Sequence, residues 1–152
     1  MAGNELQKDF KREVATLQRN IEMLADGTTA VVGTKEDPIV TNSELIPIKH
    51  YFMDGVYIRE MTMKKGIAVV GAVHKHLHMC FLLTGRVTVV NEEETVDHIA
   101  PCFIISTPGI KRVLYAHEDS IWFNTHKNPS NTDDVKQLEK EIVAISYEEY
   151  EE

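Results

Sequence analysis

Between about residues 28 and 126 the chain is a succession of short β-branched and aromatic runs, separated by turn residues. The runs read TAVVG, GVYIREMTM, GIAVVGAV, MCFLLTG, RVTVV, CFIIS, KRVLYA and SIWFNTH, and the turns include Asp54-Gly55, Lys65-Gly66, Thr84-Gly85 and Pro108-Gly109. Many short strands at this spacing are typical of an antiparallel sandwich or barrel. Because no helical periodicity interrupts them, the pattern disfavours a parallel βαβ fold. We therefore predict a mainly β protein.

A helix is predicted before this region, from about residue 4 to 26. Apolar residues recur there at helical and heptad spacing, at Phe10, Val14, Leu17, Ile21 and Leu24. Asn4, with Gln7 in a capping-box pattern, would begin the helix, and Gly27 would end it. The apolar stripe packs either on the barrel of the same chain or on further copies as a short coiled coil, and both alternatives stay open.

A second helix is predicted after the β region, in NTDDVKQLEKEIVAI, with Asn131 or Thr132 as its cap. Its buried face would carry Val135, Leu138 and Ile142. The acidic SYEEYEE that follows is expected to be a solvated tail. The predicted organisation is an N-terminal helix for packing or oligomerisation (1–27), a β-barrel (28–127), and a C-terminal helix with an acidic tail (128–152).

The length and the net charge of the chain limit the classes of function that it can have. The 152 residues suit one domain with one sizeable core. The net charge of -8 argues against a nucleic-acid surface, which needs a concentrated basic face. We find no signal peptide and no apolar run of about 20 residues, so we expect no membrane partner. Cys80 and Cys102 lie in apolar runs without CxxC spacing, which predicts buried thiols in a reducing compartment.

Three histidines, His74, His76 and His78, occupy alternate positions in the stretch VHKHLHMC. On one extended strand, alternate side chains point to the same face, so the three imidazoles would converge. Neutral imidazole is a good ligand for zinc, iron, manganese and nickel, and a site needs three or four converging donors. The stretch therefore predicts a metal site, with a polar turn between strands as the alternative.

The stretches GAVHKHLHMCFLLTG and APCFIISTPGIKRVLYA resemble the two motifs of cupins, which are small jelly-roll β-barrels. The resemblance covers about residues 45–127, and IKHYF, YIREMTM, GRVTVV and YAHEDSIWFNTH are especially similar to small cupin proteins encoded by bacteriophages and bacteria. It implies a cupin-type jelly-roll barrel between the two terminal helices. It also implies a metal pocket, for which cupins usually supply three histidines and one glutamate.

Alignment with the cupin motifs indicates which ligand positions are kept. His78 takes the place of the family's glutamate and His74 that of a histidine, whereas Ala72 and Arg112 stand where further histidines are expected. In this register the chain turns between His74 and His78, so these two lie on neighbouring strands with His76 at the turn. An alternative register treats His74 and His76 as the motif's histidine pair.

Arg112 suggests a second use for the pocket. A permanently charged guanidinium is no metal ligand, but beside imidazoles it favours an anion such as a carboxylate or phosphate. The alternative is an ordinary salt bridge to Glu118 or Asp119. Two dispersed histidines, His50 and His126, either reach the metal site from neighbouring strands or bond turns.

The sequence is compatible with two candidate functions of different classes. The incomplete ligand set and the heptad-like helix favour a non-catalytic binding or assembly module, and the resemblance to phage cupins implies a virion-associated fibre, decoration or tail component with a partial metal site. The alternative is a metal-dependent enzyme of isomerase or dioxygenase type. In that enzyme His74, His76 and His78 hold the metal, and Arg112 anchors a small polar or carboxylate substrate.

Cofactor, partners and location are expected as follows. The cofactor is a divalent transition metal (zinc, iron, manganese or nickel), with a metal-free pocket as the alternative. A heptad seam permits dimers and trimers, so we expect a homo-oligomer, and other phage structural proteins are further candidate partners. The expected location is the host cytoplasm or the virion.

Overall fold

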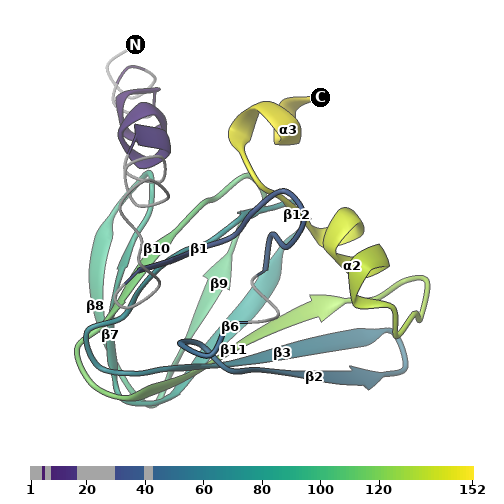
Figure 1. Cartoon of the computed structure of the whole chain (residues 1–152), viewed down its shortest axis with the longest axis horizontal. Helices are drawn as coiled ribbons and strands as arrows, with labels where there is room; N and C mark the ends of the chain where they lie inside the picture. Colours follow the sequence, from purple (N-terminus) through teal and green to yellow (C-terminus); the bar gives the residue numbers. More distant parts are fainter. Residues whose placement is uncertain (1–4, 6–7, 17–29, 40–42) are drawn as a thin grey trace.

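The computed structural model describes residues 5, 8–16, 30–39 and 43–152. Two five-stranded sheets pack face to face, and the helices gather toward one side of the resulting barrel (Figure 1). The first sheet, in spatial order, consists of β1 (Ala30–Val32), β4 (Ala68–Val70), β10 (Val113–Ala116), β7 (Arg86–Val90) and β8 (Thr95–Ile99). The second consists of β2 (Ile48–Met53), β3 (Val56–Met63), β11 (Ser120–Lys127), β6 (His78–Thr84) and β9 (Cys102–Ser106).

The strands of both sheets are paired mostly antiparallel, as the sequence predicts. One pair departs from this pattern, since β1 and β4 run parallel, with Val31 opposite Val69. A small third sheet joins β5 (Val73–His74) to β12 (Val143–Ala144) in antiparallel pairing. The mainly β, jelly-roll barrel class is confirmed, and the domain boundaries at residues 27 and 127 remain a prediction.

The core lies between the two sheets and follows from the period-two alternation of their strands. Trp122 of β11 is 1% exposed and packs among Met61 and Leu82 of the second sheet and Leu114 of the first. Burial of large apolar side chains from both sheets contributes about 1.5–3 kcal/mol for each, which makes this cluster the main source of stability.

Glycines permit the tight turns between strands. Gly85 joins β6 to β7 with φ of 87°, a conformation that favours glycine. A Cβ there would also collide with Asp119 and Ser120. The predicted turn at this position is confirmed, and it carries the chain from the second sheet to the first.

The described part of the N-terminal helix, residues 8–16, has the predicted conformation. Its Val14 is buried, and Lys11 lies 4.5 Å from the centre of the Tyr147 ring and 3.7 Å from a carboxylate oxygen of Glu151. These contacts are made within the same chain. Outside the described residues lie the predicted cap Asn4 with Gln7, the stripe residues Leu17, Ile21 and Leu24, and the predicted end Gly27.

The C-terminal helix α2 (Val135–Ile142) buries Leu138 and Ile142, as predicted. Its cap is Asp134, whose side chain accepts hydrogen bonds from the backbone of residues 136 and 137. The predicted caps Asn131 and Thr132 are therefore wrong. Thr132 instead accepts a hydrogen bond from the backbone N–H of Asp134, which is a turn preceding the helix.

The acidic C-terminal segment forms a short helix, α3 (Tyr147–Glu151), in place of the predicted solvated tail. Ser146 caps it by accepting a hydrogen bond from the backbone of Glu149. Tyr147 is only 8% exposed and packs against Val73 and Ala144, so an aromatic anchor overrides the acidic composition. Among the described residues, no helix is long and apolar enough to cross a membrane.

Candidate metal centre

Three histidines meet at one end of the second sheet. His74 ends β5, His78 begins β6, and His126 lies near the end of β11. One ring nitrogen from each lies within 4.8 Å of those of the other two. The ring centroids are 4.2 Å apart for His74 and His78, 4.4 Å for His78 and His126, and 5.5 Å for His74 and His126. These three residues form one compact cluster, which we call the histidine triad.

Strand pairing brings the triad together. β11 is antiparallel to β6 with Thr125 opposite Met79, so the next residue, His126, faces the start of β6, where His78 lies. Both side chains point inward and are nearly buried, at 4% and 5% exposure. His74 reaches them from β5, which β12 holds in place by antiparallel pairing.

Burial keeps the triad neutral. It lowers the pKa of His78 to about 4, and the positive charge of Arg112 adds to the effect. Burial also lowers the pKa of His74 and of His126 well below the usual value, with the neighbouring His78 as the next contribution. A neutral imidazole has a lone pair available for a metal, whereas a protonated one has none. The triad is therefore competent to bind a metal at neutral pH.

The ring nitrogens fit a metal ligand set. The Nδ1 of His78 lies 3.2 Å from the carbonyl oxygen of His76, so this nitrogen carries the proton and Nε2 keeps the lone pair. The Nδ1 of His74 is buried without a hydrogen-bond partner, which is costly unless a ligand satisfies it. Nitrogen ligands of a tetrahedral zinc site lie about 3.3 Å apart. The nitrogens of the triad lie within 4.8 Å of one another, so the rings would draw closer around an ion.

Arg112 lies directly against the triad. Its side chain is 4% exposed, and Nη2 donates a hydrogen bond to Nε2 of His78 and another to Sγ of Cys80, both at 3.3 Å. The guanidinium carbon lies 5.7 Å from the ring centre of Trp122. A permanent positive charge therefore stands next to one of the three candidate ligands.

Asn124 organises the inner face between the triad and the core. Its Oδ1 accepts hydrogen bonds from Nε1 of Trp122 and from Sγ of Cys80, each at 3.2 Å. Burial raises the pKa of the Cys80 thiol. Because the thiol stays protonated and bonded, Cys80 is a structural donor and not a nucleophile, as its apolar surroundings in the sequence predict.

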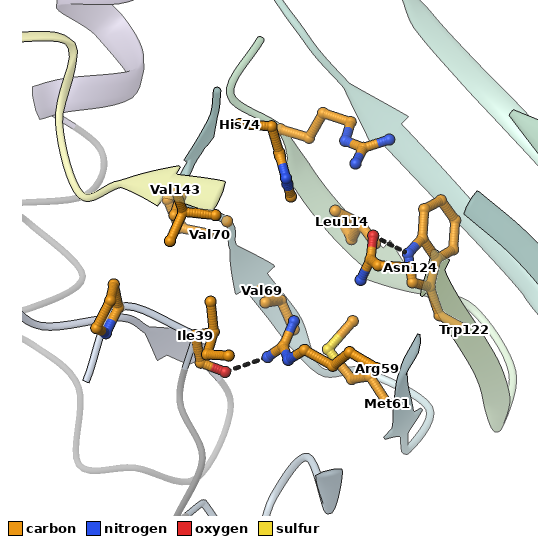
Figure 2. A pocket seen from close by; sticks show the side chains of 14 residues that line it. Ile39, Arg59, Met61, Val69, Val70, His74, Leu114, Trp122, Asn124 and Val143 are labelled. Atoms are coloured by element: carbon orange, nitrogen blue, oxygen red, sulfur yellow. Dashed lines mark hydrogen bonds between the residues drawn. The ribbon is translucent and has the colours of Figure 1, made fainter. Parts of the chain in front are cut away.

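A pocket of about 40 Å³ lies between the sheets beside the triad. Its polar walls come from His74, Asn124, Arg59 and Arg112, and apolar side chains supply the rest. Figure 2 shows His74 and Arg59 on opposite sides of this space, with the hydrogen bond between Trp122 and Asn124 on the wall between them. Within the part of the chain that the structure describes, no aspartate or glutamate lines the pocket.

The structure separates the histidines that the sequence grouped. His74 and His78 lie together on neighbouring strands, with the chain turning between them. His76 lies outside the triad, because its Nε2 is 3.0 Å from the carbonyl oxygen of Glu141. His50 is also outside, with its Nδ1 2.6 Å from the Tyr57 hydroxyl.

The structure also places the two residues that stand where cupin motifs have further histidines, Ala72 and Arg112. Ala72 is buried and lines the pocket without offering a ligand atom. The alternative salt bridge of Arg112 to Glu118 or Asp119 is not among the ion pairs of the described residues, and Asp119 instead binds Lys64 at 3.2 Å. Anion binding by Arg112 remains a prediction.

His126 completes the triad, and sequence reasoning left it as one of two alternatives. The signal that favours it lies in SIWFNTH, where alternation places Trp122, Asn124 and His126 on one face. A strand that turns a tryptophan into the core must also turn these two polar residues inward. Their burial then requires partners or a ligand.

Comparison with solved structures identifies the fold. The KdgF protein of Halomonas sp. matches with a TM-score of 0.51 at 14% identity, over 58% of this chain and 83% of that one. An RmlC-like cupin from Shewanella frigidimarina matches with a TM-score of 0.50 at 15% identity, over 60% and 81%. A cupin superfamily protein from Desulfitobacterium hafniense matches with a TM-score of 0.50 at 9% identity, over 63% and 94%.

These identities are low, so the likeness concerns the fold alone. No protein-family model matches the chain, and no curated protein matches it. The chain has the cupin fold, as its sequence motifs predict. The closer similarity to phage-encoded cupins stays a prediction.

Proposed function

We propose that this cupin-fold protein binds a divalent transition metal through the histidine triad and holds a small polar ligand at the positions that the triad leaves open. The observation that carries the proposal is the convergence of three inward-facing, neutral histidines within 4.8 Å, of which His78 and His126 are buried and His74 is half-buried. Three protein ligands with open positions are typical of metal sites that accept water or a further ligand. Zinc, iron, manganese and nickel all suit imidazole ligands.

A bound metal would act as a Lewis acid on a carbonyl or carboxylate oxygen of the ligand. The chain's own residues supply the rest of the site. The inward-facing Asn124 offers an amide, and Arg112 offers guanidinium donors at the pocket wall. An isomerase or dioxygenase activity is the enzymatic form of this proposal, and a non-catalytic binding module is the other. Because one fold hosts many activities, the metal must be established before either.

Metal analysis of the full chain tests the proposal. Purified protein reconstituted with zinc, iron(II), manganese or nickel and then desalted is expected to retain about one equivalent of at least one metal. His126→Ala and the double variant His74→Ala, His78→Ala are expected to lose it. His76→Ala is the matched control, since that ring lies in the same stretch but bonds the Glu141 backbone. Retention of no metal by the wild type, or equal loss in the His76 variant, contradicts the proposal.

A second candidate function, assembly through the outer face of the second sheet, has an observation of its own. Phe103 and Ile105 of β9 are 62% and 59% exposed, and Leu83 of β6 is 48% exposed. Phe103 lies opposite Phe81, which lies opposite Phe123, so one row of three phenylalanines crosses the outside of the sheet. We call the outward side chains of β6, β9 and β11 the outer apolar face.

The chemistry of this face suits a second copy of the chain, and its size makes it the centre of such an interface. Its three strands, about 4.8 Å apart and about seven residues long, cover roughly 350 Å² before side-chain relief is added. A standard interface buries about 800 Å² on each partner. The row of phenylalanines carries no charge, so a two-fold axis sets like against like without repulsion. We propose a homodimer through this face. The virion role remains a prediction that the dimer neither requires nor excludes.

A further inference from the structure

Arg112 is a buried cation without an anion. Its Nη1 is buried and has no hydrogen-bond partner, and its Nη2 bonds only neutral groups among the described residues, His78 and Cys80. None of the ion pairs within the described part of the chain includes Arg112. Removing a guanidinium from water without a compensating negative charge is costly. The site therefore has a deficit of negative charge at this position.

Arg112 also occupies the lone pair that a metal would use. The Nδ1 of His78 donates to the carbonyl oxygen of His76, so Nε2 is the coordinating nitrogen, and Nε2 accepts the hydrogen bond from Arg112. A divalent cation and this hydrogen bond exclude each other. The positive guanidinium would in addition repel a cation at the triad. Metal loading therefore requires Arg112 to turn away from His78.

The adjoining pocket offers a place where an anion can meet the Arg112 guanidinium. Arg112 and Arg59 both line it, and the Nε of Arg59 is likewise buried without a partner. Two guanidinium groups with unpartnered N–H atoms, lining a space to which no described carboxylate contributes, favour an anion there. The volume of about 40 Å³ corresponds to about three water molecules, so it suits an anion of three or four non-hydrogen atoms.

We propose that a small carboxylate of formate or acetate size binds Arg112 in this pocket and thereby releases Nε2 of His78 for the metal. Metal and carboxylate then bind cooperatively, because each favours the same rotated state of Arg112. By linkage, the metal raises the carboxylate's affinity by the same factor. This inference rests on the metal site of the proposed function, which it deepens by naming the class of its ligand.

Zinc titration of the full chain by calorimetry tests the coupling. The titration is run in sodium formate and in sodium perchlorate of equal ionic strength. In the wild type, formate is expected to raise zinc affinity at least about tenfold. In Arg112→Met, which keeps the length of the side chain without its charge, zinc affinity is expected to be high in both salts, since Nε2 of His78 is already free.

The outcomes separate the two proposals. Equal zinc affinity of the wild type in both salts overturns the coupling and leaves the metal site standing. A formate effect that persists in Arg112→Met also overturns it, because formate would then act as a direct zinc ligand. Absence of binding in every case, for zinc and for iron(II), manganese and nickel alike, contradicts the proposed function itself. The reciprocal measurement needs no variant: ¹³C-formate binding followed by NMR is expected to tighten by the same factor when zinc is added, and an unchanged affinity overturns the coupling.

Discussion

The two faces of the second sheet invert the usual distribution of side chains. At the triad end, the inner face carries His78, Asn124 and His126, all at most 5% exposed, whereas the outer face carries Phe103 and Ile105, which are about 60% exposed. An ordinary sheet of this kind turns apolar side chains inward and polar ones to solvent. The inversion indicates that each face of this one sheet is built for a contact that folding of the chain alone does not supply.

The alternation of inward and outward side chains along a single strand serves both of these faces. Along β11, inward Trp122 belongs to the apolar core, while on the same face Asn124 lines the pocket and His126 joins the histidine triad. The outward residues between them, Phe123 and Thr125, remain half-buried on the outside. A change at an inner position should therefore alter stability and metal binding, and a change at an outer position should alter association.

The largest expected effect is on association. Replacing Phe103 and Ile105 with glutamate places like charges on both sides of the proposed two-fold interface, and it removes the most exposed apolar area of the outer apolar face. We expect the dimer to dissociate at least about a hundredfold more readily, as measured by analytical ultracentrifugation. Metal content should stay unchanged.

The matched control for this change is Ile99→Glu. Ile99 is 69% exposed, more than either residue of the double variant, but it lies on β8 of the other sheet. It is expected to leave the association state unchanged. A monomeric wild type, or equal dissociation in the control, would show that the outer apolar face is not the interface.

The next largest expected effect is the pH dependence of the free energy of unfolding, which comes from His78 on the inner face of the second sheet. In metal-free protein, the folded state keeps His78 neutral down to a pKa of about 4, while the unfolded chain binds a proton near pH 6.5. The unfolded state therefore binds more protons between these values, and the free energy of unfolding falls as pH decreases from about 6.5 to 4. For His78 alone the full difference is about 3 kcal/mol.

Urea unfolding at a series of pH values measures this dependence. His78→Gln, which cannot protonate in this range, should flatten the slope relative to the wild type. The outward neighbour Met79 provides a control, since Met79→Leu should leave the slope as it is. A wild-type stability that is constant from pH 6.5 to 4 would contradict the neutral, buried state of the triad.

A smaller effect distinguishes neighbouring inner and outer residues of β11. Asn124→Leu leaves the buried Nε1 of Trp122 without an acceptor, so we expect a loss of about 1–3 kcal/mol in the free energy of unfolding by thermal or urea denaturation. Thr125→Val, one residue along and on the outer face, is expected to change it by about 0.5 kcal/mol or less. Similar losses at both positions would mean that the two faces do not differ in this way.

Most strands of the fold could be predicted from the sequence because they are short apolar runs, and several of them are bounded by glycines in turns. β8 gave no such signal, since its residues TVDHI are half-buried or exposed and partly charged. The cap of α2 was misplaced because four candidate capping residues, 131–134, stand in succession, and only the folded geometry distinguishes Asp134 from Asn131 and Thr132.

The candidate site was predicted in part. The pairing of His74 with His78 followed from motif register, which also placed His76 at the turn. The third member, His126, depends on which strands become neighbours across more than forty residues of chain, and local pattern carries no such information. The hydrogen bond between Arg112 and His78 likewise depends on where a loop returns to the barrel, and only the folded chain provides that information.

The pairing of β5 with β12 has a consequence for the order of events during synthesis. β5 carries His74, and its partner strand, Val143–Ala144, is translated long after it. Until residues 143 and 144 have been synthesised, His74 lies on a segment without that partner strand. In the proposed metal site, one of the three ligands is therefore held in place only after α2 and the strand that follows it have been made.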